Sequence, residues 1–274
     1  MLGAMRLLFS RSKTEKDRYW LLEACAAALA LGAAFVPFMS VASVMSLLAV
    51  AAKMIAKLVG SRSRSKFRLA ERLRRFDFES RALGWPIPPT DRAEFVLAVP
   101  LDVQAKAGER TEVDSEYYTH NGKPSDERFF ANLTESVFFT HHLMTIMARR
   151  RWSQFAIAMI AFVAVLVGGA IAQPGEVIHV VLRVVGAVVA VLVAVDVFGE
   201  ARSYERGDRE CGKLLSAIRA ETRTGAPSAN EGLRLFVEYN CLLSDLPLVP
   251  DVIFDRNRAR LNQAFAAYST PAES

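Results

Sequence analysis

WLLEACAAALALGAAFVPFMSVASVMSLLAVAAKMIAKLV, residues 20–59, is an apolar stretch too long for a single membrane crossing. A helix of about 40 residues would measure about 60 Å, whereas the hydrocarbon core of a bilayer is about 30 Å thick. A break near Val36-Pro37-Phe38 divides this stretch, and Gln173-Pro174-Gly175-Glu176 divides a second one between Phe155 and Phe198. The pattern predicts two helical hairpins, and therefore four membrane-spanning helices.

Basic residues flank both hairpins on one side and are absent from the two turns. By the positive-inside rule, the turns face outward and both termini lie in the cytoplasm. Trp20 and Trp152 stand at the inner ends of the first and third expected spans, where amphipathic rings favour the interface. The basic flanks contain Arg6, Arg11, Lys13, Lys16, Arg18, Arg62, Arg64, Lys66, Arg68, Arg72, Arg74, Arg75, Arg149, Arg150, Arg151, Arg202, Arg206 and Arg209.

This arrangement divides the chain into five segments. We expect a cytoplasmic N-terminal segment (1–18), a first transmembrane hairpin (19–59), a cytoplasmic insert (60–151), a second hairpin (152–198) and a cytoplasmic helical tail (199–274). The net charge of +5 and the pI near 9.2 arise mostly beside the expected spans. We therefore attribute the excess charge to orientation and contact with anionic lipid, and not to nucleic-acid binding.

The cytoplasmic segments have helical patterns, so the fold class is all-α. Ser125 is a suitable N-cap, and neither Gly nor Pro follows before Gly168. This predicts one helix of about 45 residues that continues into the third span. Other helices are expected over 63–83, where Gly84-Trp85-Pro86 ends the helix, and over 90–99, 202–222, 230–243 and 250–268.

Polar residues within the expected spans are candidates for function because a charge in hydrocarbon costs several kcal/mol. Four of them share one face of the second span, namely Ser43, Ser46, Lys53 and Lys57. They would line an aqueous path, with His179 and Arg183 of the fourth span near its outer mouth. In the alternative interpretation, Lys53 and Lys57 extend to the inner headgroups and have only a structural role.

Three of the charged residues suggest an ion-paired cluster. Glu23, Lys53 and Asp196 would lie at comparable depth in the first, second and fourth spans. Such a cluster would hold the two hairpins together. Because four spans make thin walls for a pore, conduction would require a homo-oligomer, for which a tetramer is a guess.

Motifs of catalysis and metal binding are absent from the sequence. It contains no Walker loop, no Gly-x-Gly-x-x-Gly, no His-Glu-x-x-His and no nucleophile elbow. Cys25, Cys211 and Cys241 have no metal-ligand spacing, and we expect no disulfide. We therefore expect neither an enzyme nor a bound cofactor or metal.

The order of these segments resembles a known family. Tyr19-Trp20 opens the first span, a charged helix (Ala70 to Phe78) leads to Gly84-Trp85-Pro86, and Tyr117-Tyr118 precedes the long helix. This layout is similar to the four-transmembrane effectors of bacterial anti-phage defence that use nucleotide second messengers. The resemblance implies a bacterial inner-membrane effector that permeabilises the membrane in response to a cyclic or linear oligonucleotide made by a partner nucleotidyltransferase.

A nucleotide ligand would require cations for its phosphates and aromatic faces for its bases. Within the insert, the candidates for this role are Arg72, Arg74, Arg75, Tyr117, Tyr118 and Arg128. Their spacing is not diagnostic of a binding site.

The sequence therefore favours an oligomeric channel or pore-forming effector that is controlled by its cytoplasmic helices. Two rivals remain open at this stage. The first is a non-conducting membrane scaffold that recruits a cytoplasmic partner, and the second is a small transporter. Arg183 and His179 in the outer half of the fourth span favour conduction or transport, because an anchor would not need them.

Overall fold

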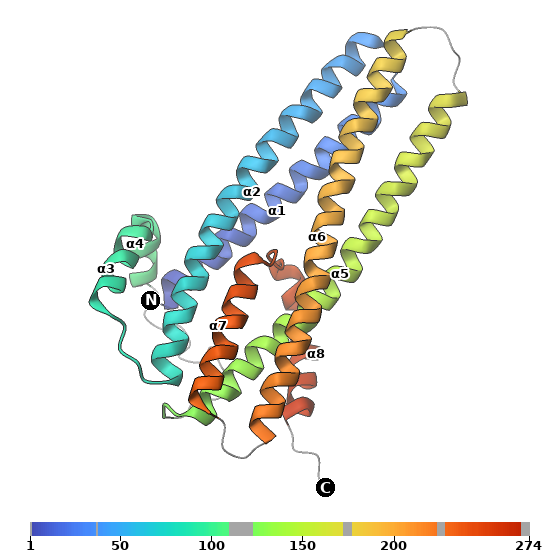
Figure 1. Cartoon of the computed structure of the whole chain (residues 1–274). Coiled ribbons are helices and arrows are strands. Elements are labelled where there is room, and N and C mark those ends of the chain that lie inside the picture. Colours follow the sequence, from blue (N-terminus) through green and yellow to red (C-terminus); the bar gives the residue numbers. More distant parts are fainter. Residues whose placement is uncertain (1, 37, 110–122, 172–176, 224–227, 270–274) are drawn as a thin grey trace. The chain divides into compact units, whose positions relative to one another are not determined.

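The computed structural model confirms that the protein is all-helical (Figure 1). It describes residues 2–36, 38–109, 123–171, 177–223 and 228–269. Over 161–195 it describes the backbone within these limits, and only the side chain of Val163. The described residues form eight α-helices and contain no β-strand.

Two long helices are followed by two shorter ones, and this order occurs twice along the chain. The bounds are α1 (Leu2–Phe35), α2 (Met39–Ala82), α3 (Pro89–Ala98), α4 (Leu101–Glu109), α5 (Asp126–Ile171), α6 (Val177–Arg223), α7 (Ala229–Asp245) and α8 (Asp251–Ser269). The sequence led us to treat the helices over 63–83 and 202–222 as separate from the spans before them, but α2 and α6 run through without a break. Neither junction contains a proline, so nothing in the sequence forces the helix to end there.

The helix α5 begins as the sequence predicts. The backbone N–H of Arg128 donates to Ser125 Oγ at 3.2 Å, which makes Ser125 the N-cap. Asp126 and Glu127 occupy the first turn, where their carboxylates complement the helix dipole. The helix then continues for 46 residues, close to the length expected from the absence of glycine and proline.

The chain forms two compact units. Unit 1 comprises Met1–Lys13, Arg64–Ile146 and Tyr204–Ser274, and unit 2 comprises Thr14–Ser63 and Met147–Ser203. Unit 2 contains both expected hairpins. The helices α1, α2, α5 and α6 each contribute residues to both units.

In unit 2, α1 and α2 pack closely along small residues. Ala26, Ala30 and Ala33 of α1 are buried, as are Ala42, Ala49 and Ala56 of α2. These residues recur at intervals of three, four or seven, which keeps them on one side of each helix. A Cβ atom added to Gly60 would lie 3.1 Å from Cδ2 of Tyr19, so glycine permits the close approach of α1 and α2 at this level.

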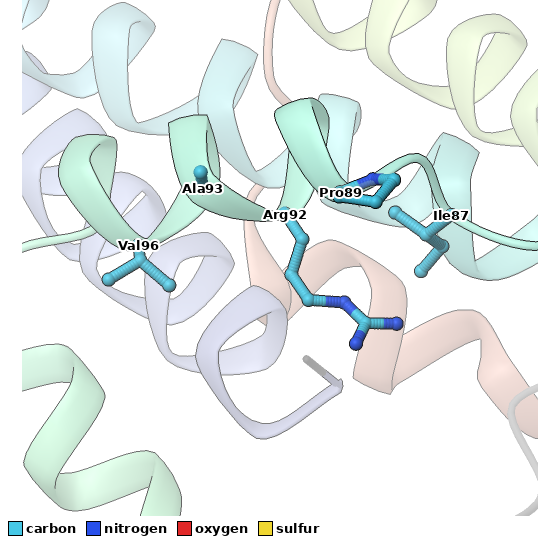
Figure 2. Close-up of a pocket in the computed structure, with 5 residues that line it drawn as sticks. All are labelled: Ile87, Pro89, Arg92, Ala93 and Val96. Carbon is cyan, nitrogen blue, oxygen red and sulfur yellow. The ribbon is translucent and has the colours of Figure 1, made fainter.

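In unit 1, the connection from α2 to α3 begins at Gly84, whose φ of +73° is readily adopted by glycine. Prolines at 86, 88 and 89 then fix an extended path into α3, and the backbone of Pro88 has the polyproline conformation (φ −56°, ψ 141°). A pocket of about 390 Å³ lies against α3 (Figure 2).

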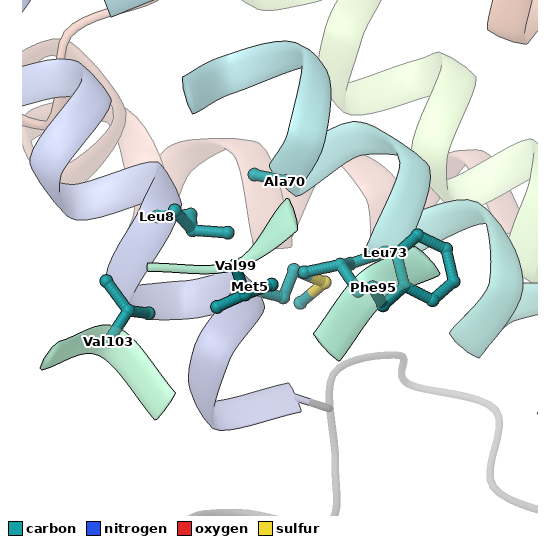
Figure 3. Packing of buried hydrophobic residues seen from close by; sticks show 7 residues of the cluster. All are labelled: Met5, Leu8, Ala70, Leu73, Phe95, Val99 and Val103. Atoms are coloured by element: carbon teal, nitrogen blue, oxygen red, sulfur yellow. The ribbon is translucent and has the colours of Figure 1, made fainter. Parts of the chain in front are cut away.

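The other side of α3 and α4 packs on the start of α1 and on the second half of α2 (Figure 3). The buried members of this cluster are Met5, Leu8, Ala70, Leu73, Phe95, Val99 and Val103. The expected N-terminal segment is therefore part of a helix, and its apolar residues form part of a core.

A second core of unit 1 is aromatic. The ring of Phe78 stacks on that of Phe236 with centroids 4.7 Å apart, and Phe129 packs edge-on against both. Elsewhere in the unit, the hydroxyl of Tyr204 donates to the carbonyl oxygen of Leu248 at 2.6 Å. Apolar side chains thus make up most of the described interior of unit 1.

Candidate functional site: the charged interior of unit 2

The described residues of unit 2 expose many large apolar side chains. Of the twenty-one large apolar side chains that are exposed among the described residues, fifteen belong to this unit. Leu47, for example, is 71% exposed. On α2 they are Val41, Val44, Leu47, Leu48, Val50, Met54, Ile55 and Leu58. A contiguous apolar surface of this kind indicates contact with lipid or with another protein.

Within the described residues, the stretch Ser40–Ala82 of α2 is the one helix long and apolar enough to cross a membrane. Only 22% of its most apolar window is buried inside the protein, so the apolar surface points outward. Most side chains of the expected third and fourth spans lie outside the described residues.

The inside of unit 2 holds a chain of ion pairs. Lys53 of α2 lies between two carboxylates, and its Nζ is 2.5 Å from Oε2 of Glu23 on α1 and 2.5 Å from Oδ2 of Asp196 on α6. Lys57, one turn further along α2, places its Nζ 3.1 Å from Oδ1 of Asp196. The structure therefore brings together Glu23, Lys53 and Asp196, the three residues that we expected to form a cluster.

A second group of charges lies next along the same helices. Glu200 of α6 accepts from Lys16 of α1 at 2.5 Å and pairs with the guanidinium of Arg151 on α5 at 2.8 Å. The Arg151 guanidinium also stacks on the ring of Trp20, 3.8 Å from its centroid. Four helices thus contribute charges to these two groups, and Lys16, Glu23 and Arg151 are all buried.

Some buried polar atoms of this interior have no hydrogen-bond partner in the described part of the protein. Oε1 of Glu23, Oγ of Ser46, Nε1 of Trp20 and Nε of Arg151 are buried and have no hydrogen-bond partner. A buried polar atom without a partner costs about 1–3 kcal/mol, which water or a rearrangement of the helices would recover. The core of unit 2 is therefore a place where hydration would be favourable.

The structure places the residues expected to line a path in different surroundings. Ser46 is buried and Lys53 is 12% exposed at its side chain, whereas Ser43 is exposed and Lys57 is 58% exposed at its side chain. Of these four residues, Ser46 and Lys53 face the interior and the other two do not. His179 and Arg183 lie in α6, but their side chains are outside the described residues.

The residues expected to bind a nucleotide do not gather in one place. Arg72 is exposed and pairs with Glu94 at 3.1 Å, and Arg75 is also exposed. Arg74 is buried, its Nε donates to Glu71 at 2.8 Å, and its guanidinium lies 5.6 Å from the ring centroid of Tyr239.

Arg128 contributes its backbone to the N-cap of α5, while Tyr117 and Tyr118 lie outside the described residues. Among the candidate arginines, none lines the pocket on α3.

Glu200 was not among the residues that we selected from the sequence, although its spacing carries a recognisable signal. It follows Asp196 by four residues on α6, and Lys16 precedes Glu23 by seven on α1. Both intervals place the two groups of charges on one face of a helix. A search for opposite charges at the same depth in neighbouring spans would have found this second group.

The remaining chemistry of the described residues does not form a site. All three cysteines are free, and burial raises the pKa of the Cys211 thiol to about 12, which makes it a poor nucleophile. No group of three or more His, Cys, Asp or Glu side chains in this part of the chain is placed to hold a metal ion.

Comparison with known proteins gives no family for this chain. No protein-family model, no curated protein and no solved structure matches it.

Proposed function

We propose that the protein is an oligomeric channel or pore-forming effector of the bacterial inner membrane, controlled by its cytoplasmic helices. The observation that carries the proposal is the arrangement of unit 2, which is apolar outside and charged inside. A water-soluble domain has the opposite arrangement, because water solvates its charges and excludes its apolar side chains. In this proposal all four long helices cross the membrane as two hairpins, with both termini in the cytoplasm.

The ion pairs suggest how such a protein would stay closed. Lys53 of α2 contacts both α1 and α6, so movement of α2 away from these two helices breaks both of its contacts at once. Separation would also give water access to the unpartnered atoms of Glu23 and Ser46. A hydrated path opened in this way would depolarise the membrane. Because four helices enclose too little space for a wide pore, the open path would require several copies.

The resemblance to anti-phage effectors suggests the signal. In this proposal, a cyclic or linear oligonucleotide made by a partner nucleotidyltransferase binds unit 1 and shifts α5 and α6, which belong to both units. The specific support for this part is the continuity of these two helices, which contain 46 and 47 residues. The alternative that we retain is a non-conducting scaffold, in which the same ion pairs only fix the helices.

The test is inducible expression in bacteria with a membrane-potential dye. The variants Lys53→Leu and Arg183→Leu are compared with wild type and with Lys213→Met, which alters an exposed lysine of unit 1. A channel predicts depolarisation that the first two variants alter and the third does not.

If the wild type is silent, the experiment is repeated with the candidate nucleotidyltransferase co-expressed. Silence under both conditions, with the protein correctly inserted, would contradict the channel and favour the scaffold.

A further inference from the structure

The exposed apolar residues of unit 1 are concentrated at α3. Six large apolar side chains are exposed among the described residues of this unit, and four of them lie between residues 85 and 101. They are Trp85, Val96, Leu97 and Leu101. Trp85 precedes α3, and the other three lie at the end of α3 and the start of α4. Exposed large apolar side chains of this kind make the segment a candidate contact surface.

This segment contains both a pocket and a side chain of the kind that fills pockets. Ile87, Pro89, Arg92, Ala93 and Val96 line the pocket of about 390 Å³ (Figure 2). Trp85 is only two residues before this lining but does not belong to it, and it is 47% exposed. The indole therefore does not fill the pocket beside it.

The lining of the pocket suits an indole ring. Four of its five residues are apolar, and the fifth, Arg92, offers a guanidinium. Arginine side chains stack on the faces of aromatic rings, with tryptophan the strongest partner. A second copy of this chain presents such a ring, its own Trp85, beside an identical pocket. A two-fold axis would let each copy insert Trp85 into the pocket of the other, because a surface of this kind is complementary to itself.

The charges of α3 and α4 argue against a lipid surface as the occupant. Between Pro89 and Lys106 the chain carries the acids Asp91, Glu94 and Asp102 against the bases Arg92 and Lys106. Helices that lie on the anionic inner leaflet are instead rich in Lys and Arg. Glu94 pairs with Arg72 and Asp102 pairs with Arg11. The surface is therefore nearly balanced in charge and lacks the basic excess of such helices, whereas an interface between copies tolerates a balanced surface.

We propose that α3 and the segment before it form a self-association surface, in which Trp85 of one copy occupies the pocket between Ile87 and Val96 of another. This inference rests on the proposed function, which requires an oligomer, and it identifies one contact between the copies of that oligomer. At this interface Trp85 would become buried and Arg92 of the other copy would stack on it. Binding would depend most on these two residues.

The test is co-purification of two differently tagged full-length chains expressed together and extracted in mild detergent. Val96→Glu and Trp85→Ala are the interface variants. The matched control is Val237→Glu, because Val96 and Val237 are both helical valines of unit 1, at 59% and 58% exposure. The proposal predicts that the interface variants reduce co-purification about tenfold or more and that the control does not.

Equal co-purification of all variants would overturn the surface on α3 and leave the proposed oligomer standing. Failure of the wild-type chains to co-purify would overturn both. Trp85→Phe keeps an aromatic ring for the pocket, so it is expected to retain most of the association. If Trp85→Phe reduced co-purification as much as Trp85→Ala does, the stacking on Arg92 would be contradicted.

Discussion

Unit 1 and unit 2 share the four long helices, yet their interiors differ. Unit 1 is filled largely by aromatic and other large apolar side chains, and unit 2 by alanines together with charged residues. Unit 1 buries Phe78, Phe129 and Phe236, whereas unit 2 buries Lys16, Glu23 and Arg151 and exposes Leu47. The difference shows that the packing of helices alone does not indicate whether a protein is surrounded by water or by lipid. The exposed side chains indicate it, because they must be compatible with the medium that they contact.

Removal of one charge from the interior of unit 2 is expected to have the largest effect. Lys53→Met leaves the carboxylates of Glu23 and Asp196 without the cation that both contact, which should lower the free energy of unfolding by about 3–5 kcal/mol. Thermal unfolding in detergent micelles measures the change. The triple variant Glu23→Gln, Lys53→Met, Asp196→Asn should recover much of the loss. If Lys53→Met is no worse than Lys213→Met at the surface of unit 1, the pairs are not structural.

A charge placed on the outside of unit 2 tests the medium directly. Leu47→Arg should cost about 2.5–3.5 kcal/mol if this face lies in hydrocarbon. The matched change in unit 1, Val237→Arg, should stay within about 0.5 kcal/mol because that side chain is exposed to water. The readout is the fraction of protein that remains in carbonate-washed membranes. If both variants remained in the membranes to the same extent, the proposal that the outside of unit 2 contacts lipid while unit 1 contacts water would be contradicted.

The polar contact inside unit 1 is expected to have a smaller effect. Tyr204→Phe removes the hydroxyl that donates to the carbonyl of Leu248 and leaves that carbonyl without its donor. The free energy of unfolding should fall by about 1–3 kcal/mol. Chemical denaturation followed by circular dichroism measures it, with Tyr268→Phe as a control on a partly exposed ring of α8. No change would mean that water replaces the tyrosine hydroxyl.

The smallest effect concerns pH and a histidine of unit 1. Burial, together with His141 and Arg260, lowers the pKa of His142, although Asp208 acts in the opposite direction. The unfolded chain therefore binds more protons than the folded one below about pH 6.5, so stability falls as the pH drops toward the folded-state pKa. Urea midpoints at about pH 5 and about pH 8 should differ less in His142→Gln than in wild type. An unchanged difference would assign the pH dependence to other groups.

The helices could be predicted from the sequence because glycine, proline and capping residues act locally. Ser125, Gly84 and the prolines after it mark ends that the structure confirms. The same rule would have predicted the continuity of α2 beyond residue 59 and of α6 beyond 198, because neither junction contains a proline. We divided both helices at the expected membrane boundary, and a change of medium does not break a backbone hydrogen-bond ladder.

The candidate site shows a similar limit. Equal depth in the expected spans predicted that Glu23, Lys53 and Asp196 would meet, since helical rise fixes the depth of a residue along a helix. The contact of Arg151 with Trp20 depends instead on the rotation of α5 against α1, for which the sequence offers no comparable rule. The ligand candidates were chosen by residue type alone, which does not predict where a side chain lies. Arg72, Arg74 and Arg75 accordingly lie in different surroundings.

The division of unit 1 among three segments of chain has a consequence for the order of synthesis. Its aromatic core needs Phe78 and Phe129 from the middle of the chain and Phe236 from the last segment. At ~5–20 residues per second, a ribosome takes about 4–14 s to make Tyr204–Ser274. During that interval all of unit 2 already exists while unit 1 lacks part of its core. A newly made chain therefore possesses unit 2, with its exposed apolar side chains, before unit 1, the half proposed to control it, is complete.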